Sequence, residues 1–472
     1  MKEQWWAGWV FLALSAVADA QHFGEAQGAT VGVSAWGVEA LSANPAGMVG
    51  RPGLLEVSLP ALSGGMQGLT LREYAFYFGG IQTPSGRQRR RLTQVDREAL
   101  ASLLVRKPLS VQFRVEPVAL LWRPHREHAL GIGLATHGWL RSQLPHGAAD
   151  AARQPVLGAD TLELQGGTAS VRVYSVATLA YARTLWQLVM LEDVPSPWRL
   201  GALHGGFALH VYRGHAYAEL LPGGWLRVFP IASWLWDSTV SWLVSARQNW
   251  HLGNADASWL ATSAGVAPSI GWGIGISLGA RWEWKNADTV EPSALIGFSL
   301  EQLGFLRWGL MESRLVVRED TVSGVLGTAW DELDARYTPL RENHSRTEGV
   351  PSVLRLGGAV ELPALGIGMP LRVSAEYAHG IGAPWAGRRV RGGIGLLLRG
   401  SNEWVPWFAI GTSWGMEGVP QVTAGIRWMP PKIGPVRAVL DVVTCSLAGW
   451  LLRNSVRSTH LGARVWGWIE DL

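Results

Sequence analysis

Apolar and polar residues alternate along much of the chain, most regularly in its last third. At the odd positions of 371–377 stand Leu, Val, Ala and Tyr, and at the even positions Arg, Ser and Glu. The segments 354–362, 422–428 and 436–442 follow the same period of two. A period of two places successive side chains on opposite faces of a strand, so each segment has one apolar and one polar face. Clusters of Gly and Pro separate the segments, which predicts about seven strands joined as hairpins after residue 350.

The first part of the chain shows the same alternation less regularly. Together with the later segments it predicts about 14 strands. The additional strand-like segments are 116–122, 128–137, 168–183, 201–212, 215–230, 232–245, 270–284 and 293–317.

Four stretches depart from the period of two. Residues 93–104 begin with a Thr suited to an N-cap and continue with apolar residues at helical spacing, which predicts a short helix. Residues 143–166, 246–265 and 328–352 are polar or contain Pro, and we expect loops there.

Alternation alone does not distinguish a soluble β-sandwich from a transmembrane barrel. The segments reach about ten residues, the length that crosses a bilayer at a tilt, and aromatic residues such as Trp404, Trp414 and Trp428 recur near their ends. Composition points the same way, since 27 Trp are hard to house in a soluble core but suit the aromatic girdles of membrane barrels. We therefore expect an all-β fold, a transmembrane antiparallel β-barrel. A Trp-rich soluble β protein is the alternative.

The N-terminus predicts export. Lys2, the apolar stretch 5–17 and Ala18-Asp19-Ala20 form the three parts of a signal peptide covering residues 1–20. No later segment has 18 consecutive apolar residues, so a helical membrane span is not expected. We therefore expect the barrel in the outer membrane of a bacterial cell, in contact with its lipid. The final stretch 460–468 alternates and ends in aromatics, which is typical of strands recognised by the barrel-assembly machinery.

Two stretches carry a family resemblance. Residues 28–48, with Asn44-Pro45-Ala46-Gly47, resemble the N-terminal signature of barrels related to the long-chain fatty-acid transporters. Residues 55–80 are similar to an uncharacterised Bacteroidota-type barrel family. The resemblance implies that residues 21–52 form a plug inside a barrel of residues 53–472, which carries a loop and short-helix insertion at about 80–108.

The Asn-Pro-Ala motif suits a plug for physical reasons. Pro fixes the backbone and Asn bonds to turn amides, while small neighbours fit a crowded interior. An ordinary Asn-Pro turn is the simpler interpretation of the same residues.

The polar faces of the predicted strands carry charged residues that a barrel would direct into its lumen. Pairing across neighbouring strands is the favoured interpretation, and pore lining or retention of the plug are the alternatives. These residues are Arg355, Glu361, Arg372, Glu376, Arg391, Arg427, Arg437, Asp441 and Arg464.

Motifs that could carry chemistry have simpler explanations. Residues 411–415 match the nucleophile-elbow pattern around Ser413, but they lie within an alternating strand. His125 with His128, and His204 with His210 and His215, have spacings of strands and turns rather than of a metal site. We expect no catalytic residue, metal or cofactor, and the scattered basic residues with a net charge of +4 argue against nucleic acid as a partner.

Three functions follow. The resemblance implies an outer-membrane barrel for passive transport of hydrophobic small molecules. The alternative is a non-transport structural or assembly platform for surface or secreted proteins. A hydrolase in the lumen is a third option, which would need a Ser or His with an activating partner at about 3 Å.

Overall fold

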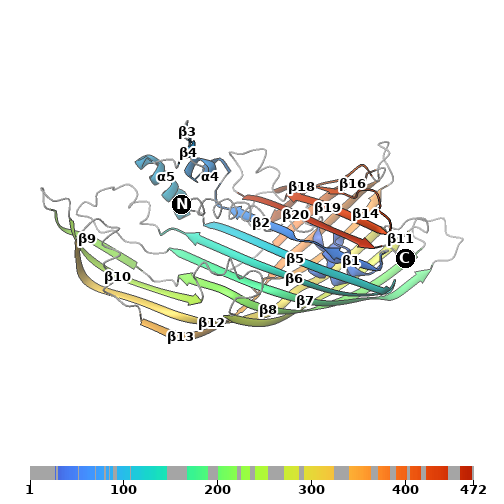
Figure 1. Ribbon diagram of the computed structural model, residues 1–472, viewed down its shortest axis with the longest axis horizontal. Helices are drawn as coiled ribbons and strands as arrows, with labels where there is room; N and C mark the ends of the chain where they lie inside the picture. Colours follow the sequence, from blue (N-terminus) through green and yellow to red (C-terminus); the bar gives the residue numbers. More distant parts are fainter. Residues whose placement is uncertain are drawn as a thin grey trace.

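A computed structural model shows a closed antiparallel β-barrel with 14 strand positions (Figure 1), as the alternation predicted. The described residues are 27, 30–50, 53–69, 71–78, 81–83, 86–88, 93–106, 108–145, 167–189, 200–220, 225–233, 240–253, 270–285, 292–323, 340–362, 370–382, 390–400, 404–415, 421–444 and 458–469. The predicted signal peptide lies outside them.

The strands follow one another around the ring in chain order. The first strand position closes the ring, because it pairs with the strands on both sides of it. Here β1 (Leu55–Ser58) and β2 (Ala61–Gln67) lie end to end, and both pair with β5 and β20. The remaining wall strands are β5 (Leu109–His125), β6 (His128–Gln143), β7 (Thr168–Val189), β8 (Leu200–Leu220), β11 (Gly271–Lys285), β12 (Pro292–Ser323), β14 (Ser352–Leu362), β15 (Leu371–Ile381), β16 (Val390–Leu398), β17 (Trp407–Gly415), β18 (Gln421–Trp428), β19 (Val436–Thr444) and β20 (Ser458–Ile469).

Three further strands extend the wall at the end away from the C-terminus (Figure 1). Along β12, β10 (Val240–Gly253) takes over the place of β11, and β13 (Leu340–Gly349) takes over the place of β14. The third strand, β9 (Trp225–Ser233), pairs with β10. The loops predicted at 246–265 and 328–352 were therefore wrong over residues 246–253 and 340–349. β13 has no apolar face (LRENHSRTEG), so its pairing with β12, and not its side-chain pattern, makes it a strand.

The connections define the two ends of the barrel. Residues 126–127 join β5 to β6, and residues 286–291 join β11 to β12, at the end where β20 finishes. At the opposite end, longer stretches of chain separate successive wall strands: 24 residues between β6 and β7, and the inserts after β2, β8 and β12. Bacterial barrels have short periplasmic turns and longer extracellular loops, so the two ends are the short-turn end and the long-loop end.

The insertion between β2 and β5 contains two helices, α4 (Leu71–Phe78) and α5 (Gln94–Arg106), and a small hairpin of β3 (Ile81–Thr83) and β4 (Gly86–Gln88). The helix predicted at residues 93–104 is confirmed as α5. At its start the amide of Asp96 donates to Thr93 Oγ1, and the Thr93 amide donates to the Asp96 carboxylate. None of the described helices has the length and apolar character needed to cross a membrane.

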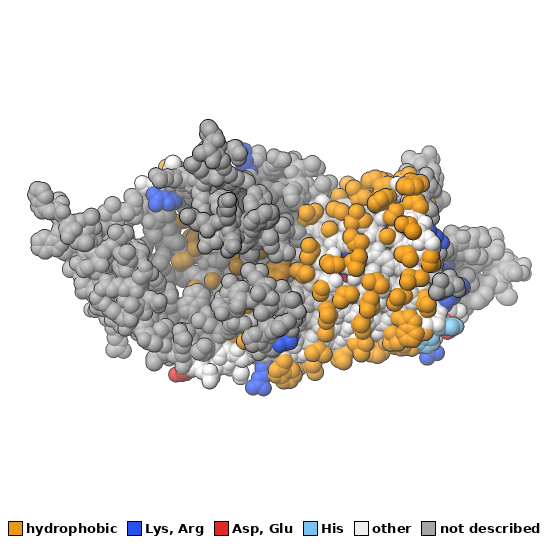
Figure 2. Space-filling view, in the orientation of Figure 1, with side chains coloured by type: hydrophobic (Ala, Val, Ile, Leu, Met, Phe, Trp, Pro, Cys, Tyr) orange, Lys and Arg blue, Asp and Glu red, His pale blue; other side chains and the backbone are white. Residues whose placement is uncertain are grey.

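The outer wall carries the apolar residues of the alternating pattern (Figure 2). Outward positions of β11 such as Ile274, Ile276 and Leu278 are 44–47% exposed, whereas the intervening Gly and Ser face inward. Trp272 and Trp282 bracket this band. At ~3.3 Å per residue and a tilt of about 40°, their separation spans ~25 Å along the membrane normal, the height of the apolar band of such barrels.

The position of this apolar band in the membrane can be tested by substitution. Ile276→Arg places a charge at the middle of the apolar wall, and we expect it to lower the free energy of unfolding by about 2–4 kcal/mol. The measurement is urea unfolding of the barrel folded into lipid vesicles. Leu185→Arg, at an exposed position of β7 near the short-turn end, is the matched control and should cost about 0–1 kcal/mol. Equal losses for the two variants would show that Ile276 does not face lipid.

Candidate functional site in the barrel interior

The N-terminal segment, residues 30–50, lies inside the ring of strands. It consists of α3 (Val31–Ser34) and two short 3-10 helices, η1 (Gly37–Leu41) and η2 (Pro45–Met48). α3 contacts β12, β14 and β15, η1 contacts β1, β5 and β6, and η2 contacts β6, β7, β8 and β11. A segment that touches strands on several sides of a closed ring must occupy its interior, here in the short-turn half.

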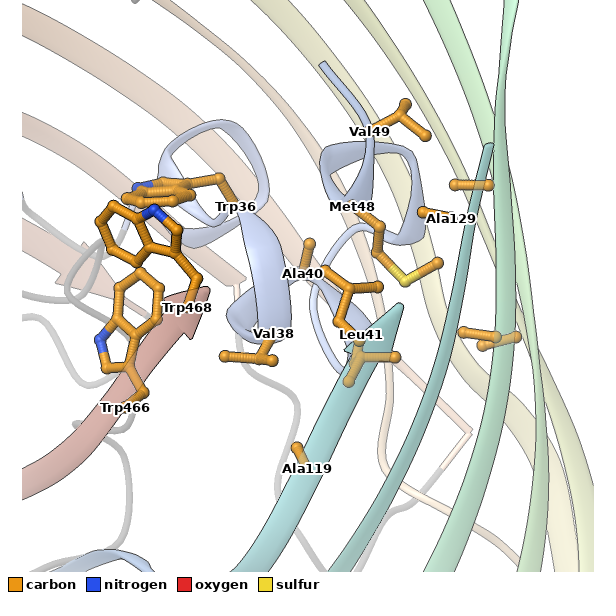
Figure 3. Packing of buried hydrophobic residues seen from close by; sticks show 14 of the residues in the cluster. Trp36, Val38, Ala40, Leu41, Met48, Val49, Ala119, Ala129, Trp466 and Trp468 are labelled. Atoms are coloured by element: carbon orange, nitrogen blue, oxygen red, sulfur yellow. The ribbon is translucent and has the colours of Figure 1, made fainter. Parts of the chain in front are cut away.

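The wall facing the segment is built from small residues. Apolar residues of the segment, among them Leu41 and Met48, pack against alanines of β5, β6, β7 and β8 (Figure 3). A Cβ on Gly131 would stand 2.2 Å from Leu41 Cδ2. The alanines of this wall are Ala119, Ala129, Ala180, Ala182 and Ala208.

The Asn-Pro-Ala turn rests on a pair of glycines. Asn44 is fully buried: its Oδ1 accepts from the Ala46 amide at 3.2 Å, and its Nδ2 donates to Gly32 O at 3.0 Å. Gly206 and Gly279 face each other across β8 and β11. A Cβ on Gly279 would stand 2.1 Å from Asn44 Oδ1, and one on Gly206 would stand 2.5 Å from the carbonyl carbon of Pro45. The turn therefore approaches the wall as closely as only glycine allows.

An ion triad links the segment to the last strands. The Arg427 guanidinium donates to both oxygens of Asp441 at 2.7 and 2.9 Å, and to Glu39 Oε1 at 3.0 Å. All three side chains are buried. Trp466 Nε1 donates to the same Asp441 carboxylate at 2.9 Å. Charge-assisted bonds of this kind hold the segment only while all partners are present.

Aromatic rings surround this triad. Trp36 of the segment packs edge-on against Trp466 and Trp468, with ring centroids 4.9 and 5.8 Å apart (Figure 3). The Arg427 guanidinium lies 5.7 Å from the Trp36 ring and 5.3 Å from the Trp466 ring. The last two Trp of β20 thus face the interior and the N-terminal segment instead of lipid.

Backbone carbonyls of the segment are held by cations of the wall. Arg281 Nη1 donates to Ala35 O at 2.8 Å, Lys285 Nζ to Gly50 O at 2.8 Å, and Arg123 Nε to Met48 O at 2.6 Å. Arg123 also pairs with Glu56 at 2.6 Å, and Glu56 accepts from the amide of Val38 at 2.9 Å. The start of β1 and the segment therefore share one buried polar network.

The described charges among those predicted for the lumen lie on strand faces opposite the exposed apolar residues. Arg355 pairs with Glu301 at 2.7 Å and with Glu376 at 3.0 Å, so it bridges three neighbouring strands. Glu361 lies 3.1 Å from Arg399 and 3.9 Å from Arg372.

The predicted charges nearest the C-terminus have other partners. Arg464 pairs with Glu116, and Arg437 lies over the ring of Trp468. The side chain of Arg391 lies outside the described residues. These pairs join parts of the wall to one another, and Arg427 also joins the wall to the segment.

A second buried cluster fills one side of the long-loop half. Rings of Trp139, Tyr174, Tyr212 and Trp308 come together there with aliphatic residues of β12. Beside them the Arg172 guanidinium donates to both oxygens of Glu348 at 2.9 and 3.0 Å. This cluster packs part of the interior above the N-terminal segment with apolar and aromatic side chains.

The three histidines of β8 are buried wall residues. His204 bonds to Thr184, and His215 bonds to Ser175. His210 Nε2 lies 2.7 Å from Ser277 Oγ, the separation stated above as a requirement for a lumen hydrolase. That hydroxyl also accepts from the amide of Gln302, whose φ of 52° marks a bulge in β12. Because Ser277 is 1% exposed, its role in this geometry is to satisfy the bulge amide.

The other motifs occupy structural positions. Ser413 is a buried residue of β17, and His125 and His128 flank the turn between β5 and β6, where His128 Nδ1 lies 2.8 Å from the Tyr181 hydroxyl. Within the described ranges no group of three or more His, Cys, Asp or Glu is placed to hold a metal.

Several residues of the interior carried no signal in the sequence. Glu39 and Glu56 stand among apolar neighbours in the first part of the chain, and only their distant partners Arg427 and Arg123 reveal why they are buried. The glycines at 206 and 279 could have been noticed as inward positions of predicted strands. Their contact with residues 44–46 could not be predicted, because it joins segments far apart in the chain.

Comparison with known proteins gives one family. The model of a family of unknown function, DUF5723, matches residues 45–415, a range that begins at the Pro of the Asn-Pro-Ala turn. This confirms the resemblance to an uncharacterised barrel family. No curated protein matches the chain.

Several solved structures resemble the chain over nearly its whole length. The Pseudomonas putida toluene transporter TodX has a TM-score of 0.45 and 11% identity, covering 96% of this chain and 99% of that chain. A Pseudomonas aeruginosa FadL homologue has a TM-score of 0.42 and 9% identity, covering 96% and 98%. The CymD monoaromatic hydrocarbon channel has a TM-score of 0.41 and 10% identity, covering 92% and 93%.

Proposed function

The chain belongs to DUF5723, a family of unknown function, and we propose that it is an outer-membrane channel for hydrophobic small molecules whose N-terminal segment is its plug. The observation that carries the proposal is the position of residues 30–50 inside a closed barrel with an apolar outer wall. Such a barrel spans a bilayer with its lumen as the one route between the two sides, so a segment held in that lumen controls passage.

The way the segment is held supports a plug. Its contacts with the wall include the buried ion triad and hydrogen bonds from Arg281, Lys285 and Arg123 to backbone carbonyls. In addition, the Asn-Pro-Ala turn packs closely on Gly206 and Gly279. Each contact is polar or closely fitted, and none is covalent. The segment can therefore leave or shift without any bond being cut.

The lining of the long-loop half supports a hydrophobic cargo. A hydrophilic pore needs polar side chains along its route, whereas Trp139, Tyr174, Tyr212 and Trp308 form a packed aromatic cluster in the interior. Charged residues of the interior are paired with one another, as Arg172 with Glu348 and Arg355 with Glu376. Paired charges favour a neutral apolar solute over an ion.

The test is transport by the full chain in proteoliposomes. We expect naphthalene to enter vesicles that contain the barrel faster than vesicles without protein, and glucose to enter both at the same rate. Variants that loosen the segment should raise the naphthalene rate further. Equal entry of the two solutes, or no protein-dependent entry even after the segment is loosened, would contradict the channel.

The second candidate is a platform for the assembly of surface or secreted proteins. The extension of the wall by β9, β10 and β13 beyond the membrane band favours it, because a partner could dock there. The same experiment separates the two functions. A platform carries no naphthalene in any variant.

A further inference from the structure

On the outer wall, the side chains change from apolar to mostly polar at one row of residues that pair in register across neighbouring strands. On β6, β7, β8, β11 and β12 the row Ile132, Leu179, Leu209, Ile276 and Leu303 is entirely apolar, and so is the next row toward the long-loop end, Leu134, Ala177, Val211, Ile274 and Phe305. The row after that consists of Thr136, Ser175, Arg213, Trp272, Arg307 and, on β13, Thr347. The apolar band therefore ends at this row, which we name the rim row.

The centre of the rim row is an Arg-Trp-Arg triplet. Trp272 pairs in register with Arg213 on β8 and with Arg307 on β12, and all three side chains are exposed. The backbones of β8 and β12 are about 10 Å apart, since β11 lies between them. At this spacing two guanidiniums can converge on one phosphate or each bind one of two phosphates on the same headgroup.

The neighbouring positions of the row add hydroxyl groups and a second polar cluster. Thr136 Oγ1 lies 2.9 Å from Ser175 Oγ, and His215 Nε2 lies 2.8 Å from that same hydroxyl. Directly above the triplet, β13 replaces β14, and the outward Gly309 faces Ser345. Gly309 and Ser345 present no large apolar side chain there, so the triplet stands at the edge of the apolar band.

We propose that Arg213, Trp272 and Arg307 form a binding site for the phosphate groups of an outer-leaflet lipid. Trp prefers the level of the headgroups, and Arg binds phosphate through a planar fork of donors. The triplet lies at the long-loop end, which faces the outside of the cell. The inference concerns the outer wall and does not depend on passage through the lumen.

The experiment measures lipid retention by the full chain purified in detergent. The probes are bis-phosphorylated lipid A and the same lipid A after removal of its phosphates, and bound lipid is counted by native mass spectrometry. The wild type is expected to retain the phosphorylated form with a roughly thirtyfold preference, the ratio that corresponds to about 1 kcal/mol for each Arg at a charged surface and ~1.4 kcal/mol per tenfold. This preference should fall as salt is added.

The double variant Arg213→Gln with Arg307→Gln is expected to lose the preference. Arg183→Gln, an exposed Arg of β7 at the short-turn end, is the matched control and should keep it. Resistance to urea unfolding verifies that each variant is a folded barrel. The proposal is overturned if the wild type retains both lipids equally, if the folded double variant keeps its preference, or if Arg183→Gln loses as much as the double variant.

Discussion

Gly279→Val is expected to displace the N-terminal segment and so to open the lumen of the barrel. Its side chain would occupy the place of Asn44 Oδ1, which stands 2.1 Å from the ideal Cβ position, and the Ala46 amide lies only 3.0 Å away. Because the Ala46 amide is a backbone group and the Asn44 side chain is hydrogen-bonded on both of its polar atoms, neither can swing aside as a free side chain would. The turn must move away from β11, and the hydrogen bond from Asn44 to Gly32 O moves with it.

The size of the effect follows from the cost of overpacking. A cost of about 1–3 kcal/mol to the bound segment multiplies the population of the released segment by about fivefold to 150-fold, at ~1.4 kcal/mol per tenfold. Naphthalene entry into proteoliposomes should rise by a similar factor, and limited proteolysis should reach residues 30–50. Since the wall itself keeps its strand pairing, the barrel should remain folded.

Gly133→Ala is the matched control. Gly133 also faces the segment, but a Cβ there would have no neighbour closer than 3.7 Å. We expect this variant to transport and to resist proteolysis as the wild type does. If Gly279→Val transported no faster than Gly133→Ala while residues 30–50 had become accessible to protease, the segment would not be the barrier.

Arg427→Met is expected to be the most destabilising single change in the interior. It leaves Glu39 and Asp441 buried at 0% and 1% exposure with their shared cation removed. Breaking a buried ion pair from one side typically costs about 3–5 kcal/mol, because the remaining charge has no compensation. The measurement is the free energy of unfolding in urea, followed by Trp fluorescence, since Trp36 and Trp466 lie against Arg427.

Two further variants separate lost charge compensation from lost packing. Adding Glu39→Gln and Asp441→Asn to Arg427→Met removes the uncompensated charges, and we expect it to restore part of the stability. Arg97→Ala, at an exposed position of α5, should change the free energy of unfolding by less than about 0.5 kcal/mol. An Arg427→Met barrel as stable as the Arg97→Ala barrel would show that the triad contributes nothing.

The strands were predictable because the lipid imposes a strict pattern on them. Residues 371–377 alternate since one face meets acyl chains and the other meets the lumen, and β15 follows that alternation. β13 was missed because residues 342–345 are exposed on both of its faces, so that no apolar alternation is required of them. α5 was predictable from local information alone, since its first turn is stabilised by Thr93 and Asp96.

The interior was only partly predictable. Inward charges such as Arg427 and Asp441 could be identified from the period of two, but their third partner Glu39 stands in the distant N-terminal segment. Trp466 and Trp468 illustrate the same limit. Their place near the end of the last strand was expected for a strand recognised by the barrel-assembly machinery, but the contact of both rings with Trp36 could not be predicted.

The pairing of β1 with β20 also sets the order of assembly. Leu55 pairs with Ile469, so the ring cannot close until the last strand has been made and delivered. The N-terminal segment directly precedes β1, and its triad requires Asp441 and Arg427 from the last third of the chain. Enclosure of the segment and closure of the wall are therefore coupled steps of folding. Long-range pairing of this kind is slow, which leaves the segment exposed for most of the folding time.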